Sequence, residues 1–234
     1  METQNNTYLF YDLETTGLNV AFNQILRFAA IRTDLELNEI ERKTINVKLR
    51  DDIVPSANAL IINRLSLNDI IDGECEYEAI VDIYKLFNQP GTINMGYNSI
   101  SFDNEFLRYN YYRNLLDPYI HEWKNDCCKM DIMPITLYYY LFKPGALKWP
   151  GNEIDKKLKL EHINAANNLA DGMAHDALVD VEVSWQRIDY VLLLLLGIWT
   201  YVNFISLSIK GKENEKEGCQ GHVPSKLERY RRAP

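Results

Sequence analysis

The stretch YLFYDLETTG (residues 8–17) places two carboxylates in a run of apolar residues. Asp12 and Glu14 are two positions apart, and successive side chains of a β-strand point to opposite faces of the sheet. As a strand, the run therefore presents both carboxylates on one face, close together. Like charges at this spacing repel each other. Taken alone, the stretch is compatible with a solvated edge strand and with a cation site.

Strands come first along the chain, and helices follow. Apolar alternation, turn residues and helical spacing predict strands at residues 8–14, 28–33, 44–49 and 93–98, and helices at residues 78–87, 101–114, 131–142 and 158–168. A last helix is expected to begin near residue 174. The short connections between the first three strands favour hairpins, and the order of the elements predicts a mixed α/β sheet covered by helices.

The composition indicates a globular domain of substantial size, and the charge argues against a simple basic nucleic-acid binder. The 234 residues suffice for a substantial core, and 47% are hydrophobic. The net charge of −8 is concentrated before residue 190, because residues 190–234 contain seven Lys or Arg against four Glu. An acidic domain that acts on an anionic substrate needs cations to neutralise both, and metal ions would serve.

The cysteine pattern and the amino terminus indicate a reducing compartment. The four cysteines have no CxxC spacing, which predicts free thiols rather than disulfides or a zinc site. We identify no signal peptide ahead of the first strand. The expected location is the cytoplasm.

Three further residues could complete a metal site. Asp103, in GYNSISFDNEF, follows a predicted strand and lies where a helix begins, so helix capping is an alternative role for it. His175 and Asp180, in AHDALVD, are five positions apart, which separates them by about 140° on an ideal helix. They can point to one place only if His175 precedes the helix. Oxygen ligands of this kind suit Mg²⁺ or Mn²⁺.

In their order along the chain, these motifs resemble the DEDDh 3′→5′ exonucleases, and more closely the exonuclease I family. The resemblance covers residues 8–189 and rests on YDLETTG, FAAIRTD, GYNSISFDNE, YYRNLLDPY, LKLEH and AHDALVD. It implies a ribonuclease H-like fold, in which helices flank a mixed β-sheet.

The resemblance also implies the site and its reaction. The metal-binding acids of the family fall on Asp12, Glu14, Asp103 and Asp180, and its general base falls on His175. The implied reaction is hydrolysis of single-stranded DNA from the 3′ end to 5′-mononucleotides, with two Mg²⁺ ions and with Mn²⁺ as an alternative. An unperturbed histidine pKa of about 6.5 suits proton transfer near neutral pH.

Contacts with the substrate follow from the same resemblance. The DNA-contacting positions of the family fall on Arg108, Tyr119, Trp123 and Lys159. Lys159 stands where relatives more often carry Arg, which replaces a bidentate phosphate contact by a point charge. Thr15 and Thr16 are expected to meet the terminal nucleotide through backbone groups. For the two aromatic residues, ordinary packing is an equally good explanation.

The resemblance ends near residue 189, which predicts an exonuclease domain over residues 1–189. Residues 191–209 carry no charge and would span about 28 Å as a helix, and residues 210–234 are polar and expected to be disordered. Exonuclease I relatives continue instead with SH3-like and helical domains that close around DNA. The apolar segment is a C-terminal membrane anchor, an abnormal end of a truncated coding sequence, or a buried helix.

Other functions remain open on the same residues. The chain could trim RNA or proofread on the same scaffold, or it could be a non-catalytic, membrane-attached nucleic-acid binder. The expected partners are single-stranded DNA, a single-stranded DNA-binding protein as in the family, and a membrane through residues 191–209.

Overall fold

The computed structural model describes residues 6–63, 65, 67–151, 158–167 and 181. The strands are β1 (Thr7–Thr15), β2 (Ile25–Thr33), β3 (Glu39–Asn46), β4 (Thr92–Gly96) and β5 (Cys128–Asp131). The helices are α1 (Ala57–Asn63), α2 (Leu67–Ile71), α3 (Glu76–Phe87), α4 (Asp103–Arg113), α5 (Ile132–Phe142) and α7 (Leu160–Asn167). Short 3₁₀ turns are η1 (Ile120–Glu122), η2 (Lys124–Asp126) and η3 (Pro144–Ala146).

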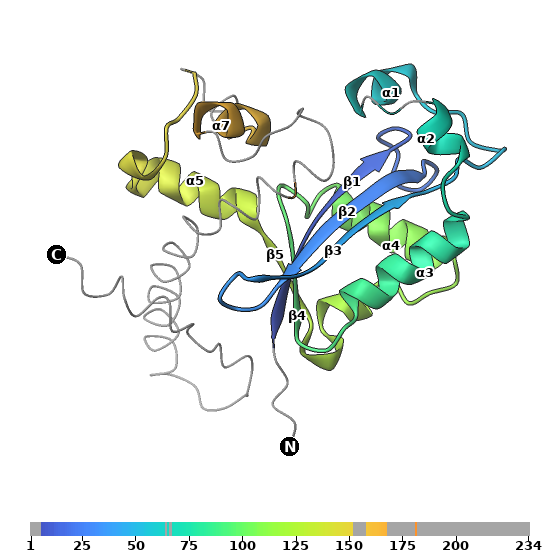
Figure 1. Ribbon diagram of the computed structural model, residues 1–234, viewed down its shortest axis with the longest axis horizontal. Helices are drawn as coiled ribbons and strands as arrows, with labels where there is room; N and C mark the ends of the chain where they lie inside the picture. Colours follow the sequence, from blue (N-terminus) through green and yellow to red (C-terminus); the bar gives the residue numbers. More distant parts are fainter. Residues whose placement is uncertain (1–5, 64, 66, 152–157, 168–180, 182–234) are drawn as a thin grey trace.

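Within the described part of the chain, five strands form one mixed sheet in the order β3-β2-β1-β4-β5. β1, β2 and β3 pair antiparallel through short connections, as the sequence predicts. β4 pairs with β1 in parallel, and β5 pairs with β4 in parallel. β1 is therefore the central strand, with an antiparallel neighbour on one side and a parallel neighbour on the other (Figure 1).

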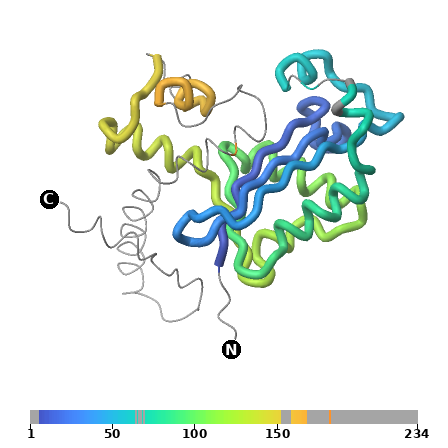
Figure 2. Tube along the Cα trace, viewed as in Figure 1, coloured from blue at the N-terminus to red at the C-terminus, as the bar shows by residue number. Residues whose placement is uncertain are grey.

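Helices cover both faces of the sheet, and the alternation along β1 decides which side chains meet which helix. Leu9, Tyr11 and Leu13 pack in one core with side chains of α3 and α4. Tyr8 and Phe10 pack on the opposite face in a second core with side chains of α5. Figure 2 shows α3 and α4, in teal to green, and α5, in yellow, on different sides of the blue strands. The mixed α/β architecture predicted from the sequence is confirmed.

The carboxyl ends of the parallel strands β1, β4 and β5 lie on the same side of the sheet. Gly96 at the end of β4 is paired with Asp131 at the end of β5, and Asp12 and Glu14 lie near the end of β1. In open α/β sheets, ligands bind outside the carboxyl ends of the strands. The topology thus brings acidic residues from separate strands to the carboxyl ends of the sheet, where a ligand can bind.

The prediction for the third strand is wrong at both ends. The apolar residues indicate residues 44–49, whereas β3 covers Glu39–Asn46. β3 lies at the edge of the sheet, and most of its side chains are exposed or half-buried. Edge strands carry polar and charged residues that limit pairing with other chains, so apolar alternation marks only the buried end of this one.

Three elements have no counterpart in the prediction, namely α1, α2 and β5. The helix α1 exposes Ile61 and Ile62, so its apolar residues do not mark a buried face. β5 is four residues long, and all its side chains are half-buried. The predicted helices that correspond to α3, α4, α5 and α7 agree to within two residues at each end. The helix predicted from residue 174 lies outside the described residues.

No helix in the described ranges is long and apolar enough to cross a bilayer. Residues 191–209, for which a membrane anchor is one prediction, lie outside those ranges, as do residues 210–234. Cys75, Cys127 and Cys128 are free thiols, which confirms the prediction for the cysteines that the structure describes.

Candidate active site

Asp12 and Glu14 continue the face of β1 that begins with Tyr8 and Phe10. The two aromatic side chains are buried in the core beneath α5. Asp12 lies beyond that core and is half-buried, and Glu14 is 8% exposed. The face is therefore apolar where a helix covers it and acidic at its end. This is the arrangement that alternation along a strand predicts.

Asp103 is the first residue of α4, and only 7% of its surface is exposed. The pKa of its carboxyl is raised to about 7, mainly because burial removes water from the charged form. The negative charge of Asp131 raises this pKa further, whereas backbone hydrogen bonds at Asp103 and Leu13 lower it. A carboxylate held in this way is stabilised by a nearby cation.

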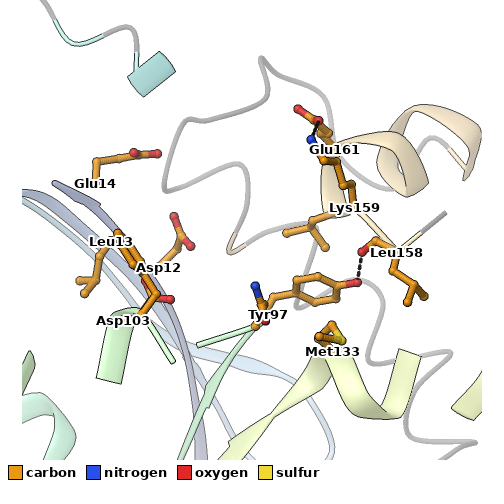
Figure 3. Close-up of a pocket in the computed structure, with 12 residues that line it drawn as sticks. Asp12, Leu13, Glu14, Tyr97, Asp103, Met133, Leu158, Lys159 and Glu161 are labelled. Atoms are coloured by element: carbon orange, nitrogen blue, oxygen red, sulfur yellow. Dashed lines mark hydrogen bonds and ion pairs between the residues drawn. The ribbon is translucent and has the colours of Figure 1, made fainter. Parts of the chain in front are cut away.

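One pocket of about 570 Å³ brings the three acids together. Asp12, Glu14 and Asp103 line it from the end of β1 and the start of α4. Figure 3 shows these acids on one side of the pocket and Lys159 and Glu161 on the other. The structure thus brings together three of the acids that the sequence predicts for one site, and their binding of a metal stays a prediction.

The wall opposite the acids comes from the segment that precedes and begins α7. The hydroxyl of Tyr97 donates a hydrogen bond to the backbone oxygen of Leu158 (Figure 3). Lys159 follows in the chain, its side chain is 60% exposed, and its Nζ lies 3.7 Å from Oε1 of Glu161. Met133 of α5 adds an apolar surface beside Tyr97. The pocket thus has an acidic side and a side with an apolar surface and a cation.

The donor set of the acidic side fits a hard divalent cation. All three side chains offer carboxylate oxygens, which Mg²⁺ and Mn²⁺ prefer. Burial of Asp103 gives a further reason for a cation to bind there. Among the described residues, however, no three acidic, histidine or cysteine side chains are close enough together to form a metal site on their own.

His175 and Asp180, the general base and the fourth acid implied by the resemblance, lie outside the described residues. Val181, which follows Asp180 in the sequence, is described. It is fully buried in the core that also contains Tyr8 and Phe10 of β1. Val181 thus packs on the face of the sheet that carries Asp12 and Glu14.

Thr15 and Thr16, predicted to contact the terminal nucleotide, have structural roles in the β1–β2 connection. The hydroxyl of Thr15 donates to the backbone oxygen of Gly17 at 2.8 Å. The backbone carbonyl of Thr15 accepts a hydrogen bond from the side-chain amide of Asn63 at 3.0 Å. The hydroxyl of Thr16 accepts from the backbone N–H of Gln24 at 2.9 Å. Contact of either threonine with a nucleotide stays a prediction.

Arg108, a predicted phosphate contact, is already engaged in ion pairs. Its guanidinium contacts Glu105 one turn away on α4 and Glu122 of η1, to which it lies within 2.6 Å. Glu122 also accepts from Lys129 at 2.9 Å. The guanidinium lies 5.1 Å from the ring centre of Tyr119, a distance typical of a cation–π contact. Any phosphate at Arg108 therefore competes with two carboxylates.

The two predicted aromatic contacts are exposed. Tyr119 is 53% exposed and Trp123 is 67% exposed, so neither side chain is buried in the core. Of the predicted DNA contacts, the pocket lining includes Lys159 but not Arg108, Tyr119 or Trp123. The aromatic pair is thus available to a ligand outside the pocket.

Sequence reasoning gave no functional role to Asp131, although it lies at the carboxyl ends of the parallel strands, as Asp12 and Glu14 do. Its carboxylate accepts the backbone N–H groups of Asn98, Ile100 and Met133. The available signal was an acid between an apolar segment and a helix, which marks a helix cap but not a neighbouring site.

The pKa of Asp103 predicts how the stability of the metal-free protein depends on pH. The folded-state pKa is about 7 against 3.8 for the free group, so the folded state holds the proton more tightly. This group therefore lowers stability progressively as pH rises from about 4 to above 7. Asp103→Asn should remove that penalty. In EDTA, we expect the variant to gain about 2 to 3 kcal/mol more relative to the native chain at pH 8 than at pH 5.

Urea unfolding at the two pH values measures this difference. Asp34→Asn is a control, because Asp34 also accepts a backbone N–H, that of Asn38, but in the turn between β2 and β3. A gap between native chain and Asp103→Asn that does not widen from pH 5 to pH 8 contradicts the prediction.

The comparisons with known proteins agree with this geometry. The model of the RNase T exonuclease family matches residues 9–186. That range contains every acid that lines the pocket and the predicted positions His175 and Asp180.

Curated relatives are named exodeoxyribonuclease I, and the solved structures that match are of E. coli exonuclease I. The chain is 36% identical over 181 residues to exodeoxyribonuclease I of Escherichia coli, and 33% identical over 178 residues to that of Haemophilus influenzae. These matches cover 76% and 75% of this chain, and 38% of each relative. A zinc-bound structure of E. coli exonuclease I with single-stranded DNA superposes with a TM-score of 0.79 at 33% identity, over 85% of this chain and 43% of that one.

A second structure, E. coli exonuclease I with a dA16 oligonucleotide, gives a TM-score of 0.78 at 34% identity, over 84% of this chain and 42% of that one. The likeness confirms the predicted ribonuclease H-like exonuclease fold. The chain spans about two fifths of the length of the curated relatives that it matches.

Proposed function

Because the chain belongs to the RNase T exonuclease family, we propose that it is a metal-dependent 3′→5′ exonuclease that hydrolyses single-stranded DNA to 5′-mononucleotides. The observation that carries the proposal is the shared pocket of Asp12, Glu14 and Asp103. These acids come from two separate parts of the chain, and they are the ones that the family motifs designate. The relatives are exodeoxyribonucleases, and solved relatives bind single-stranded oligonucleotides.

In the proposed reaction, Asp12, Glu14, Asp103 and Asp180 hold two divalent cations, Mg²⁺ or Mn²⁺. When bound, such a pair activates a water and stabilises the charge on the phosphate and the leaving 3′ oxygen. The buried position of Asp103 favours this role, because a carboxylate with a raised pKa is stabilised by positive charge. Asp180 is proposed as the further ligand because it matches the fourth acid of the family motif.

His175 is the proposed general base. A neutral imidazole can accept the proton of the attacking water. The products carry the phosphate at the 5′ end, because the bond to the 3′ oxygen of the preceding nucleotide breaks.

The substrate is proposed to enter over Lys159 and to extend past exposed aromatic residues. Lys159 supplies a cation at the rim of the pocket. Tyr119 and Trp123 offer exposed rings on which bases can stack without regard to sequence. The net charge of −8 makes such local contacts more important, because the whole protein repels nucleic acid.

The test is release of labelled nucleotides from the 3′ end by the full chain in Mg²⁺. Single-stranded DNA, duplex DNA and single-stranded RNA of one sequence are compared, with EDTA as the metal-free arm. We expect fastest release from single-stranded DNA and none in EDTA. Faster release from RNA would support the RNA-trimming alternative, and no release from any strand in Mg²⁺ or Mn²⁺ would contradict the proposal.

Trp123→Ala should weaken binding of single-stranded DNA. Loss of one stacked base costs about 1 to 3 kcal/mol, so we expect the Kd to rise ~5- to ~150-fold. Fluorescence anisotropy with labelled oligonucleotide in Ca²⁺ measures the Kd without turnover. Phe142→Ala is the control, since Phe142 is a similarly exposed aromatic at the far end of α5. Equal Kd values for native chain and Trp123→Ala would remove Trp123 from the substrate path.

A further inference from the structure

Asp131 lies where three elements meet, at the carboxyl ends of the parallel strands. It is the last residue of β5, it is paired with Gly96 at the end of β4, and it is the N-cap residue of α5. Its side chain accepts the backbone N–H of Met133 at 2.9 Å, which is the ordinary capping bond. Capping alone would use one oxygen of the carboxylate.

The other bonds of Asp131 reach a different segment, the connection between β4 and α4. The backbone N–H of Asn98 donates to Oδ1 at 2.8 Å, and that of Ile100 donates to Oδ2 at 3.2 Å. Asn98 has a φ of 56°, in the left-handed region, so the chain reverses sharply at this point. Both oxygens of Asp131 are thus occupied by backbone N–H groups, and the carboxylate fixes the shape of this reversal.

The connection leads directly into the first turn of α4, which carries Asp103. The carbonyl of Ser99 accepts the N–H of Asn104 at 2.9 Å. Ser99 is itself buried and packs against Gly96. A side chain at position 96 would place its Cβ 2.5 Å from the Cβ of Ser99, so only glycine allows this close contact. The position of Ser99, which Asn98 and Ile100 flank, therefore sets the position of the helix start.

A second contact holds the same helix turn from the side of β1. The hydroxyl of Tyr11 donates to Oδ1 of Asn104 at 2.6 Å, and both groups are buried. Asp103 is thus fixed from two directions, by β1 through Tyr11 and by β5 through Asp131. Only the second depends on a charged group, and Asp131 is close enough to act on the carboxyl of Asp103 electrostatically.

We propose that Asp131 is a positioning residue for the metal site, which holds the β4–α4 connection so that Asp103 faces Asp12 and Glu14. This inference rests on the proposed function. Asp131 is not a ligand in this scheme, since its oxygens accept backbone N–H groups. Without it, the connection and the first turn of α4 gain freedom, and the site loses its arrangement before a cation arrives.

Two variants separate this role from helix capping. Asp131→Ser keeps a good N-cap for α5 but is too short to hold Asn98 and Ile100. Asp131→Asn keeps one oxygen acceptor and presents an N–H₂ group where the second carboxylate oxygen accepted a backbone N–H. Asp34→Asn is the matched control, because it removes a carboxylate that accepts a backbone N–H in the distant β2–β3 turn.

The measurement is Mn²⁺ binding to the full metal-free chain by calorimetry at pH 8, with thermal unfolding of each variant alongside. Groups that orient metal ligands typically contribute about 10- to 100-fold to metal affinity. We expect Asp131→Ser and Asp131→Asn to bind Mn²⁺ about 10-fold more weakly than the native chain. We expect Asp34→Asn to bind it with native affinity. The Mn²⁺ concentration for half-maximal nucleotide release should rise in parallel, with a smaller loss of rate at saturating Mn²⁺.

Native Mn²⁺ affinity in Asp131→Ser would overturn the proposal, and so would equal weakening in Asp34→Asn, because general destabilisation would then explain the effect. The proposed function fails separately if the native chain binds Mn²⁺ but releases no nucleotides. If the native chain binds no Mn²⁺, both are overturned.

Discussion

Asp12→Asn is expected to reduce nucleotide release by ~10³-fold or more. Metal ions contribute several kcal/mol to stabilisation of the transition state in such reactions, and each 1.36 kcal/mol corresponds to a factor of ten. Asp12 lies between the apolar part of the β1 face and Glu14, on the acidic side of the pocket. Its proposed role is to hold a cation, and an amide of the same size holds Mg²⁺ far more weakly than a carboxylate.

The fold of the Asp12→Asn variant should be intact, because Asp12 is half-buried at the end of a strand whose core contacts lie elsewhere. Thermal unfolding in EDTA checks this, and single-turnover release of a labelled 3′ nucleotide in Mg²⁺ measures the rate. Glu161→Gln is the matched control, since Glu161 lines the opposite side of the same pocket and corresponds to none of the family acids. It should lose far less activity. Comparable losses in the two variants would show that negative charge in the pocket matters in general, and not the position of Asp12.

His175→Ala is expected to slow hydrolysis by ~10²- to ~10⁴-fold and to leave metal binding largely intact. The reason is that a general base takes a proton during the reaction but is not proposed to hold a cation. The native rate should fall at acid pH, because a protonated imidazole cannot accept the proton. The variant should lose this dependence.

Single-turnover rates from pH 5.5 to 8.5 at saturating Mg²⁺ test the role, and calorimetry with Mn²⁺ tests the metal site. His162→Ala is the control, because His162 is half-exposed on α7, with Nε2 3.4 Å from Oε1 of Glu161, and it is no catalytic position of the family. Unchanged turnover in His175→Ala, or an equal loss in His162→Ala, would remove His175 from the proposed role.

Much of the fold could be predicted from the sequence because the signals are local. The alternation of YLFYDLET assigns Tyr8, Phe10, Asp12 and Glu14 to one face, and the structure places them there. Helix α3 is recognisable from the spacing of its apolar residues. The helices predicted at α4, α5 and α7 agree with the structure to within two residues at each end. Local signals fail for β3 and β5, because edge strands are only partly buried and need not be apolar.

The site was predictable in its acids and less so in its surroundings. The order of the motifs predicted that Asp103 and Asp12 belong to one site, and in the structure both residues line one pocket. The ion pair of Arg108 with Glu122 joins residues 14 positions apart on different elements, so no local pattern announces it. The same holds for Tyr97 and Leu158, which are 61 positions apart and shape the wall opposite the acids.

By itself, the sequence determined that two carboxylates share one face of a strand, because side-chain alternation is a property of the extended backbone. It also determined, through the order of its motifs, which family the chain belongs to. Only the tertiary structure decided that Asp103 is buried and that Asp131 holds the connection leading to it. Burial and the raised pKa of Asp103 depend on which atoms replace water around the carboxyl, and those atoms come from strands and helices far apart in the sequence.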